Sequence, residues 1–136
     1  MADLDCEIVT PEGQVFSGRA EMVVVPGVEG ELGVFARHAP TVARLRAGEV
    51  RVRTEGPVWY AFATDQGYFK VQRDRALVLV QSAVPVDEID VEQARALADD
   101  ARARIGLADS GDDSVDRHRA ERDLAFAENL LEIAGR

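Results

Sequence analysis

The first 83 residues alternate short runs rich in β-branched residues with turns that contain Gly and Pro. Short strands at this spacing are typical of an antiparallel sandwich or barrel. A parallel α/β sheet would need helical periods between the strands, and the sequence has none. Trp59, the only tryptophan, falls in one of these runs and is expected to be buried. The predicted strands cover residues 6–10, 21–25, 50–54, 58–63, 68–71 and 76–81.

After Pro85 the apolar positions change to a spacing of three and four, which predicts two amphipathic helices. Asp87 or Asp90 is expected to cap the first helix, and Gly106 to end it. A polar loop at 109–113 precedes a second helix that starts near Ser114. Two helices joined by so short a loop form an antiparallel hairpin. The first stripe is Val91, Ala94, Ala98, Ala101 and Ile105, and the second is Ala120, Leu124, Ala127, Leu131 and Ala134, widened by Phe126, Leu130 and Ile133.

The pattern therefore predicts an α+β chain with a β-sandwich over residues 1–84 and a helical hairpin over 87–136. Charge follows the same division. Residues 1–83 carry 11 Asp/Glu against 9 Lys/Arg, whereas residues 84–136 carry 14 against 7. The net charge of −9 makes nucleic acid and anionic membrane poor partners.

Cys6 is the only cysteine, which excludes an internal disulfide and a cysteine-rich metal site. No apolar run approaches the roughly 20 residues that span a bilayer, so membrane insertion is not expected. The first five residues lack the basic and apolar regions of a signal peptide, which leads us to expect a cytoplasmic protein.

Nucleotide and catalytic motifs are weak. Residues 13–18 have the glycine spacing of a phosphate loop, but Arg19-Ala20 stands where Lys-Ser/Thr is required, and the segment is expected between strands. His38 has no partner that would make it catalytic, so a turn histidine bonded to backbone is the better interpretation. His118, on an acidic helix, is expected to be solvated, and no residue is assigned to a metal or to catalysis.

Glycines recur at every third position through residues 27–33. They are compatible with a tight loop whose glycines adopt positive φ angles. They are also compatible with a loop that presents Glu29 and Glu31 to a partner, because two carboxylates are costly to bury. Spacing alone leaves both interpretations open.

The segment from Thr10 to Pro40 resembles the epsilon subunits of bacterial F-type ATP synthases. The resemblance is carried by residues 10–13 (TPEG), 15–18 (VFSG), 25–27 (VPG), 29–33 (EGELG) and 38–40 (HAP), and extends through 48–52 and 67–71 to the acidic tail. It implies a ten-strand sandwich that binds the gamma subunit and the ring of c subunits. The implied ring contacts are Glu29, Gly30, Glu31, Gly33 and His38, the last in the same edge region as the glutamates.

The resemblance also implies a non-catalytic rotor subunit of a proton-translocating enzyme, without a cofactor, peripheral to the cytoplasmic face of the bacterial inner membrane. In that family the hairpin can extend into the alpha/beta catalytic head and block ATP hydrolysis. Some relatives bind ATP through Ile/Leu-Asp-x-x-Arg-Ala. Here Ile89 and Asp90 fit, but Gln93 replaces the arginine, and Arg95 lies two residues later, so at most weak nucleotide contact is expected.

Two other classes of function remain open at this point. One is a stand-alone β-sandwich that binds a small ligand or peptide, with the helices as a dimerisation element. The other is a hydrolase that uses Glu29 and Glu31 as an acid–base pair.

Overall fold

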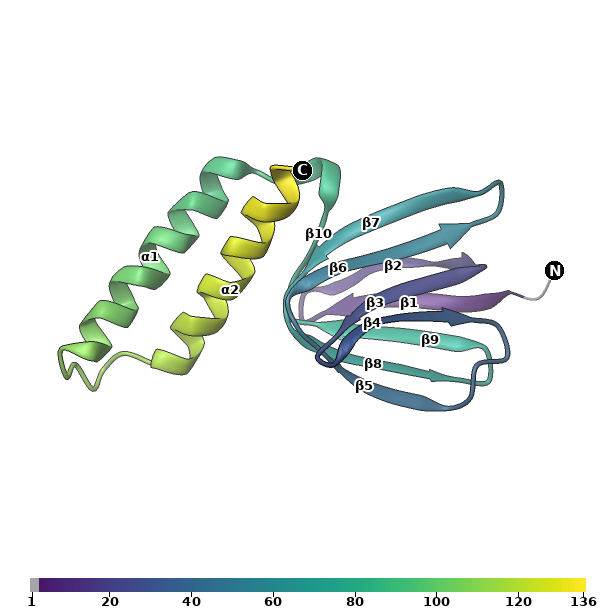
Figure 1. The fold of residues 1–136 in the computed structure, drawn as a ribbon, viewed down its shortest axis with the longest axis horizontal. Coiled ribbons are helices and arrows are strands. Elements are labelled where there is room, and N and C mark those ends of the chain that lie inside the picture. Colours follow the sequence, from purple (N-terminus) through teal and green to yellow (C-terminus); the bar gives the residue numbers. More distant parts are fainter. Residues whose placement is uncertain (1–2) are drawn as a thin grey trace. The chain divides into compact units, whose positions relative to one another are not determined.

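The computed structural model describes residues 3–136 and confirms a ten-strand β-sandwich followed by two helices (Figure 1). The chain divides into two compact units, one that ends at Pro85 and a second that comprises Val86–Arg136. The strands are β1 Leu4–Thr10, β2 Gly13–Ala20, β3 Met22–Gly27, β4 Gly30–Phe35, β5 Thr41–Leu45, β6 Gly48–Thr54, β7 Val58–Thr64, β8 Gly67–Gln72, β9 Arg75–Val80 and β10 Ala83–Pro85.

The strands form two layers that meet at β3. Strands β4, β3, β6, β7 and β10 make one layer, and β5, β8, β9, β1 and β2 make the other. A single residue pair, Gly27 with Leu45, joins β3 to β5 between the layers. On the opposite side Phe16 of β2 packs against Tyr60 and Phe62 of β7, with ring centroids 5.4 Å and 5.9 Å apart, so the sandwich is nearly closed. All strand pairs are antiparallel except β1 with β9, which is parallel.

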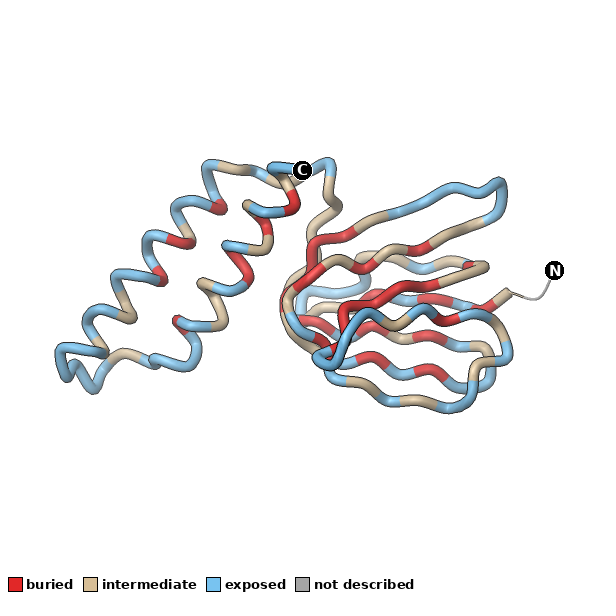
Figure 2. Tube along the Cα trace, viewed as in Figure 1, coloured by how far each residue is buried: buried red, intermediate tan, exposed pale blue. Residues whose placement is uncertain are grey.

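Buried and exposed positions alternate along the strands (Figure 2). The buried side chains are almost all apolar and form the core of the sandwich. In β6, Val50 and Val52 are fully buried, while Arg51 and Arg53 lie on the outer face. Phe69 is the largest of the fully buried side chains. Each such side chain stabilises the fold by about 1.5–3 kcal/mol relative to an exposed position. Cys6 lies in this core, where burial, followed by the nearby charge of Glu7, raises the pKa of its thiol to about 12.

Two of the sandwich predictions were wrong. Residues 13–18, expected between strands, belong to β2, which pairs along its length with β1. Its polar residues Gln14 and Ser17 are exposed because β2 is the last strand of its layer, so its pattern lacks a buried-strand signature. Trp59, expected in a buried strand, is 47% exposed, as are its neighbours Val58 and Tyr60 at 47% and 45%.

The second unit consists of a 3-10 turn at Val86–Glu88 and helices α1 Val91–Asp109 and α2 Arg117–Ala134. Asp90 caps α1 by accepting a hydrogen bond from the Gln93 N–H at 3.1 Å. Gly106 does not end the helix, because its carbonyl still accepts a helical bond from the Ser110 N–H at 3.1 Å. A helical glycine costs only about 1 kcal/mol relative to alanine, and the glycine with a positive φ (90°) is Gly111.

The second helix begins three residues later than expected. The N–H and hydroxyl of Ser114 both donate to Asp112, at 2.9 Å and 2.6 Å, which places Ser114 in the interhelical turn. The cap is Asp116, which accepts from the Arg119 N–H at 3.0 Å. Along α2 the buried face includes Phe126, Leu130 and Ile133, the residues expected only to widen the stripe. No helix in residues 3–136 combines the length and apolar character needed to cross a membrane.

Candidate partner-binding surfaces

The glycine segment forms a two-residue turn between β3 and β4 rather than a long loop. Gly27 pairs with Gly30, and only Val28 and Glu29 lie between them. Gly30 has φ +137°, a conformation that favours glycine, whereas Gly27 and Gly33 do not have positive φ. At Gly27 the constraint is close approach, because a Cβ would lie 2.7 Å from the Gly30 carbonyl oxygen. The expected positive φ angles are therefore found at one glycine of the three.

The β3–β4 turn is fixed to its neighbour strand. The Val28 N–H donates to the Arg44 carbonyl at 2.9 Å, and the Arg46 N–H donates to the Pro26 carbonyl at 3.0 Å. Val28 nevertheless exposes 54% of its side chain at the tip. The turn thus presents an apolar tip on a fixed backbone, with Glu29 exposed beside it.

The two glutamates of the turn have different environments. Glu31 is exposed, and its Oε1 accepts from Arg51 Nη2 at 2.9 Å. Glu29 has no hydrogen-bond or ion-pair partner among residues 3–136. They do not form an acid–base pair in a cleft, because Glu31 is bound to Arg51 on an exposed sheet face.

Gly33 and His38, the remaining predicted ring contacts, lie elsewhere. Gly33 lies within β4, where a Cβ would come 2.9 Å from the terminal methyl of Met22. His38 follows the far end of β4, and its Nδ1 lies 2.8 Å from the Ala39 carbonyl, as expected for a turn histidine. Six residues of β4 separate it from Glu29, which corresponds to about 20 Å along the strand. The expectation that His38 shares one edge with the glutamates is therefore wrong.

A second exposed surface, which the sequence analysis missed, covers the outer face of β5, β8 and β9. We call it the β5–β8–β9 face, defined by Val42, Arg44, Tyr68, Lys70, Arg75 and Leu79. Val42, Tyr68 and Leu79 expose 71%, 54% and 45% of their surface. Tyr68 pairs with both Arg44 and Leu79, so apolar and basic side chains lie in one row across three strands.

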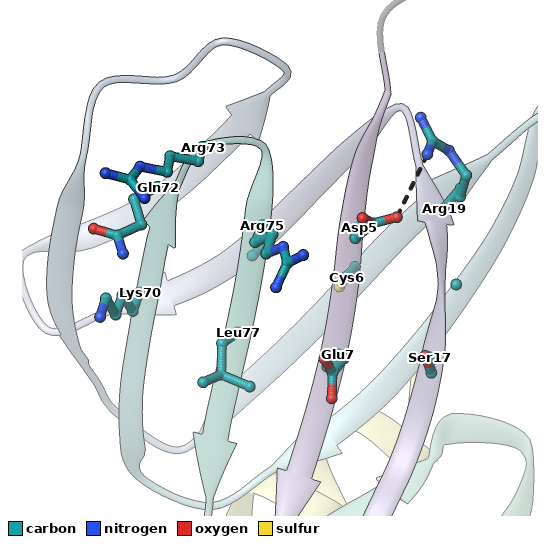
Figure 3. Close-up of a pocket in the computed structure, with 12 residues that line it drawn as sticks. Asp5, Cys6, Glu7, Ser17, Arg19, Lys70, Gln72, Arg73, Arg75 and Leu77 are labelled. Atoms are coloured by element: carbon teal, nitrogen blue, oxygen red, sulfur yellow. Dashed lines mark ion pairs between the residues drawn. The ribbon is translucent and has the colours of Figure 1, made fainter.

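Basic side chains on this face lack acidic partners. Arg44, Lys70 and Arg75 form no ion pair within the described part of the chain. Figure 3 shows Lys70, Arg73 and Arg75 around a shallow hollow that continues over β1 and β2. There Arg19 lies 3.6 Å from Asp5, and Glu7 also lines the hollow, so that end has one more acidic than basic side chain. In a chain of net charge −9, the sandwich thus carries a locally basic, partly apolar face.

The other layer of the sandwich carries Trp59, which lies between two guanidinium groups of the neighbouring strand β6. Its ring centroid is 5.9 Å from Arg51 Cζ and 5.8 Å from Arg53 Cζ, distances typical of cation–π contacts. Arg53 also approaches Glu21 at 3.6 Å. Trp59 is therefore a surface residue held by arginines of β6.

The predicted nucleotide residues are not brought together as a phosphate site. Asp90 serves as the α1 cap, and Ile89 immediately precedes it. Arg95 Nη1 binds Glu92 at 2.8 Å, so its guanidinium is already paired with an acid. Gln93 offers no positive charge.

Two ion pairs join the two helices. Arg117, the first residue of α2, binds Asp109, the last residue of α1. Arg104 of α1 donates to Asp123 of α2 at 2.7 Å and to Asp100 at 2.9 Å. The hydrogen bond to Asp123 is the main factor that raises the pKa of Arg104. The rest of the seam on the α1 side consists of buried methyl groups, those of Ala94, Ala98 and Ala101. Within residues 3–136 no group of three or more His, Cys, Asp or Glu side chains is placed to hold a metal ion.

Comparison with known proteins agrees with this architecture. Residues 3–86 match the family model of the ATP synthase Delta/Epsilon chain, beta-sandwich domain. The ATP synthase epsilon chain of Halalkalibacterium halodurans is 39% identical over 136 residues, covering 100% of both chains. The ATP synthase epsilon chain of Staphylococcus aureus (strain JH9) is 41% identical over 135 residues, covering 98% of both.

Solved structures give the same result. A chain in the Euglena gracilis mitochondrial ATP synthase (OSCP/F1/c-ring, rotational state 1) superposes with a TM-score of 0.77 at 27% identity, covering 100% of this chain and 83% of that one. A chain in the central stalk/c-ring of the Tetrahymena thermophila enzyme has a TM-score of 0.56 at 13% identity, covering 68% and 73%, which shows the shared fold. Epsilon chains are non-catalytic subunits. The chain belongs to the delta/epsilon family of ATP synthase subunits, as a member of its epsilon branch.

Proposed function

We propose that this chain is a coupling subunit of the central stalk, which links rotation of a c-ring to the gamma subunit and the catalytic head. The observation that carries the proposal is that one rigid sandwich offers two separate surfaces for partners. One is the β3–β4 turn with Glu29 and Glu31, and the other is the β5–β8–β9 face. Family membership supports it, as does the similarity to a chain from an ATP synthase assembly that includes a c-ring.

The β5–β8–β9 face is the proposed gamma contact. Exposed apolar side chains such as Tyr68 and Val42 supply area that becomes buried on binding, and the unpaired Lys70 and Arg75 favour an acidic partner surface. The β3–β4 turn is the proposed ring contact through Glu29, Gly30 and Glu31. A ring contact that included His38 would have to extend along the whole of β4.

The hairpin is the proposed regulatory element, which separates and extends to the alpha/beta head to slow ATP hydrolysis. Its support is the small stabilisation at the helix seam, where the buried side chains of α1 are alanines. Arginines exposed on the helices, such as Arg102 and Arg119, supply charges for acidic surfaces of the head. The subunit would lie peripherally at the cytoplasmic face of the bacterial inner membrane, and the coupled ion would be the proton.

Two variants of the full chain test the two surfaces separately. Tyr68→Glu places a charge at an exposed position, so the sandwich stays folded while co-purification with gamma falls. The double variant Glu29→Ala/Glu31→Ala keeps gamma but loses proton pumping driven by ATP in reconstituted vesicles. Val58→Glu, at a similarly exposed position on β7, is the matched control. Normal gamma binding by Tyr68→Glu would refute the role of the β5–β8–β9 face. Normal proton pumping by the double variant would refute the role of the β3–β4 turn.

A further inference from the structure

Charged and aromatic side chains form a continuous ladder over the outer face of β4, β3, β6 and β7. We call it the Trp59 ladder: Glu31, Arg51, Trp59, Arg53 and Glu21. Its contacts, in that order, are an ion pair of 2.9 Å, two cation–π contacts of 5.9 Å and 5.8 Å, and an ion pair of 3.6 Å. One end of the ladder is the proposed ring contact, Glu31.

The pair between Arg51 and Glu31 joins strands that are not neighbours. Both β4 and β6 pair with β3, and Val24 lies opposite Gly33 on one side and Arg51 on the other. The backbones of β4 and β6 are therefore about 10 Å apart, twice the usual strand spacing. The long side chain of Arg51 spans this separation and reaches Glu31 at 2.9 Å.

Two other groups, the Glu49 carboxylate and the Trp59 ring, lie near the Arg51 guanidinium. Its Nε is buried without a hydrogen-bond partner, and the nearest acid to that atom is Glu49 at 3.8 Å. Its guanidinium plane lies by the Trp59 ring. The 2.9 Å contact to Glu31 is thus its shortest charged contact. A planar guanidinium can make both contacts at once, whereas a lysine ammonium would keep the charge and lose the fork geometry.

We propose that Arg51 is a positioning residue, which orients the Glu31 carboxylate for the c-ring and is itself held by Trp59. The inference rests on the proposed ring contact of Glu31. A free glutamate side chain samples many rotamers, and fixing it before binding removes that cost from association. Removing Arg51 then weakens ring binding even though it removes the positive charge that compensates Glu31.

A double-mutant cycle on the full-length chain, assembled with gamma and titrated onto immobilised c-rings, tests this role. Glu31→Gln weakens binding, and Arg51→Gln weakens it roughly twofold to fivefold, which lies within the range for exposed ion pairs. In the Glu31→Gln background, Arg51→Gln has no further effect. Arg53→Gln is the matched control, since it removes the other guanidinium from Trp59 and leaves ring affinity unchanged.

Two readouts separate positioning from a structural role. Trp59 is the only tryptophan, so its fluorescence reports the ladder directly, and both arginine variants shift the spectrum while only Arg51→Gln changes ring affinity. Arg51→Lys, which keeps the charge, restores less than half of the lost affinity.

The results distinguish failure of the proposed ring contact of Glu31 from failure of the positioning role of Arg51. If Glu31→Gln leaves ring affinity unchanged, the proposed ring contact fails, and the inference fails with it. If Glu31→Gln weakens binding but Arg51→Gln does not, or strengthens it, only the positioning role is overturned. A loss caused by Arg51→Gln that persists in the Glu31→Gln background also overturns it, because Arg51 would then act independently of Glu31.

Discussion

Two ion pairs join the helices, Arg117 with Asp109 and Arg104 with Asp123. Separation of the hairpin should depend more on the second pair, because its side chains are less exposed to solvent. Replacing Asp123 with Asn preserves side-chain size and helix propensity but removes the negative charge that faces Arg104. We expect the helices to separate more readily, and the reconstituted ATP synthase to hydrolyse ATP more slowly if the separated hairpin inhibits.

The magnitude follows from the composition of the seam. Three buried alanines of α1 contribute about 0.8 kcal/mol each, or about 2.4 kcal/mol together. The ion pair is 2.7 Å long, but its side chains are 28% and 30% exposed, so solvent screening limits it to about 1 kcal/mol. Loss of about 1 kcal/mol raises the population of separated helices about fivefold.

The assay combines two measurements on one variant. A pair of probes, one on each helix, reports the interhelical distance in the full chain, and ATP hydrolysis by the reconstituted complex reports inhibition. Asp99→Asn is the matched control. It removes the same charge, but Asp99 pairs with Arg102 of its own helix at 3.5 Å and does not join the two helices. Equal effects of the two variants would show that net charge, and not the interhelical pair, controls the hairpin. If Asp123→Asn opens the helices but hydrolysis stays constant, the regulatory proposal is refuted.

Three further predictions follow from other parts of the molecule. Deleting the chain from Asp87 onward leaves a folded sandwich and raises ATP hydrolysis of the complex, whereas early melting without faster hydrolysis would show a bracing role. The isolated protein binds ATP at millimolar affinity or not at all, since Gln93 is neutral and Arg95 is paired with Glu92, and calorimetry that gives micromolar affinity would contradict this. Between pH 8 and 10 the free energy of unfolding of the wild type falls by about 1.4 kcal/mol relative to that of Cys6→Ala. The pKa of the thiol is about 12 in the folded state and 9.0 in the unfolded state, so its stabilisation is complete below pH 9 and is lost as the pH rises towards 12. Parallel curves of stability against pH for the two proteins would contradict the burial argument.

Several strands that face the core on one side could be predicted from the sequence, because their apolar and polar residues alternate. Strand β5 was not among them, although it lies between β3 and β8. Val50 and Val52 alternate with Arg51 and Arg53, and that run is β6. The edge strand β2 lacks this clear alternation of apolar and polar residues. In β2 the exposed Gln14 and the other polar residues reflect solvent on its outer side, so the segment could not be distinguished from a loop.

The candidate surfaces could be predicted only in part. Glu29 and Glu31 were expected to be exposed because carboxylates are costly to bury, and they are. The side chain of Trp59 was misplaced, because residue type indicates a preference for burial while the position of a strand in the layers decides it. The contact between Arg51 and Glu31 depends on β3 lying between their strands, and one sequence contains no signal for that arrangement.

The parallel pair of β1 and β9 has a consequence for how the chain acquires its structure. Asp5 lies opposite Arg75, 70 positions later, so the layer cannot be completed until nearly the whole sandwich sequence is available. Closing so long a loop is entropically costly, and proteins dominated by such distant pairings fold in milliseconds to seconds. The helical hairpin has only local pairings and can form in microseconds. During synthesis the sandwich therefore remains incomplete until β9 emerges from the ribosome, and this interval is when its unpaired strands are most exposed to aggregation.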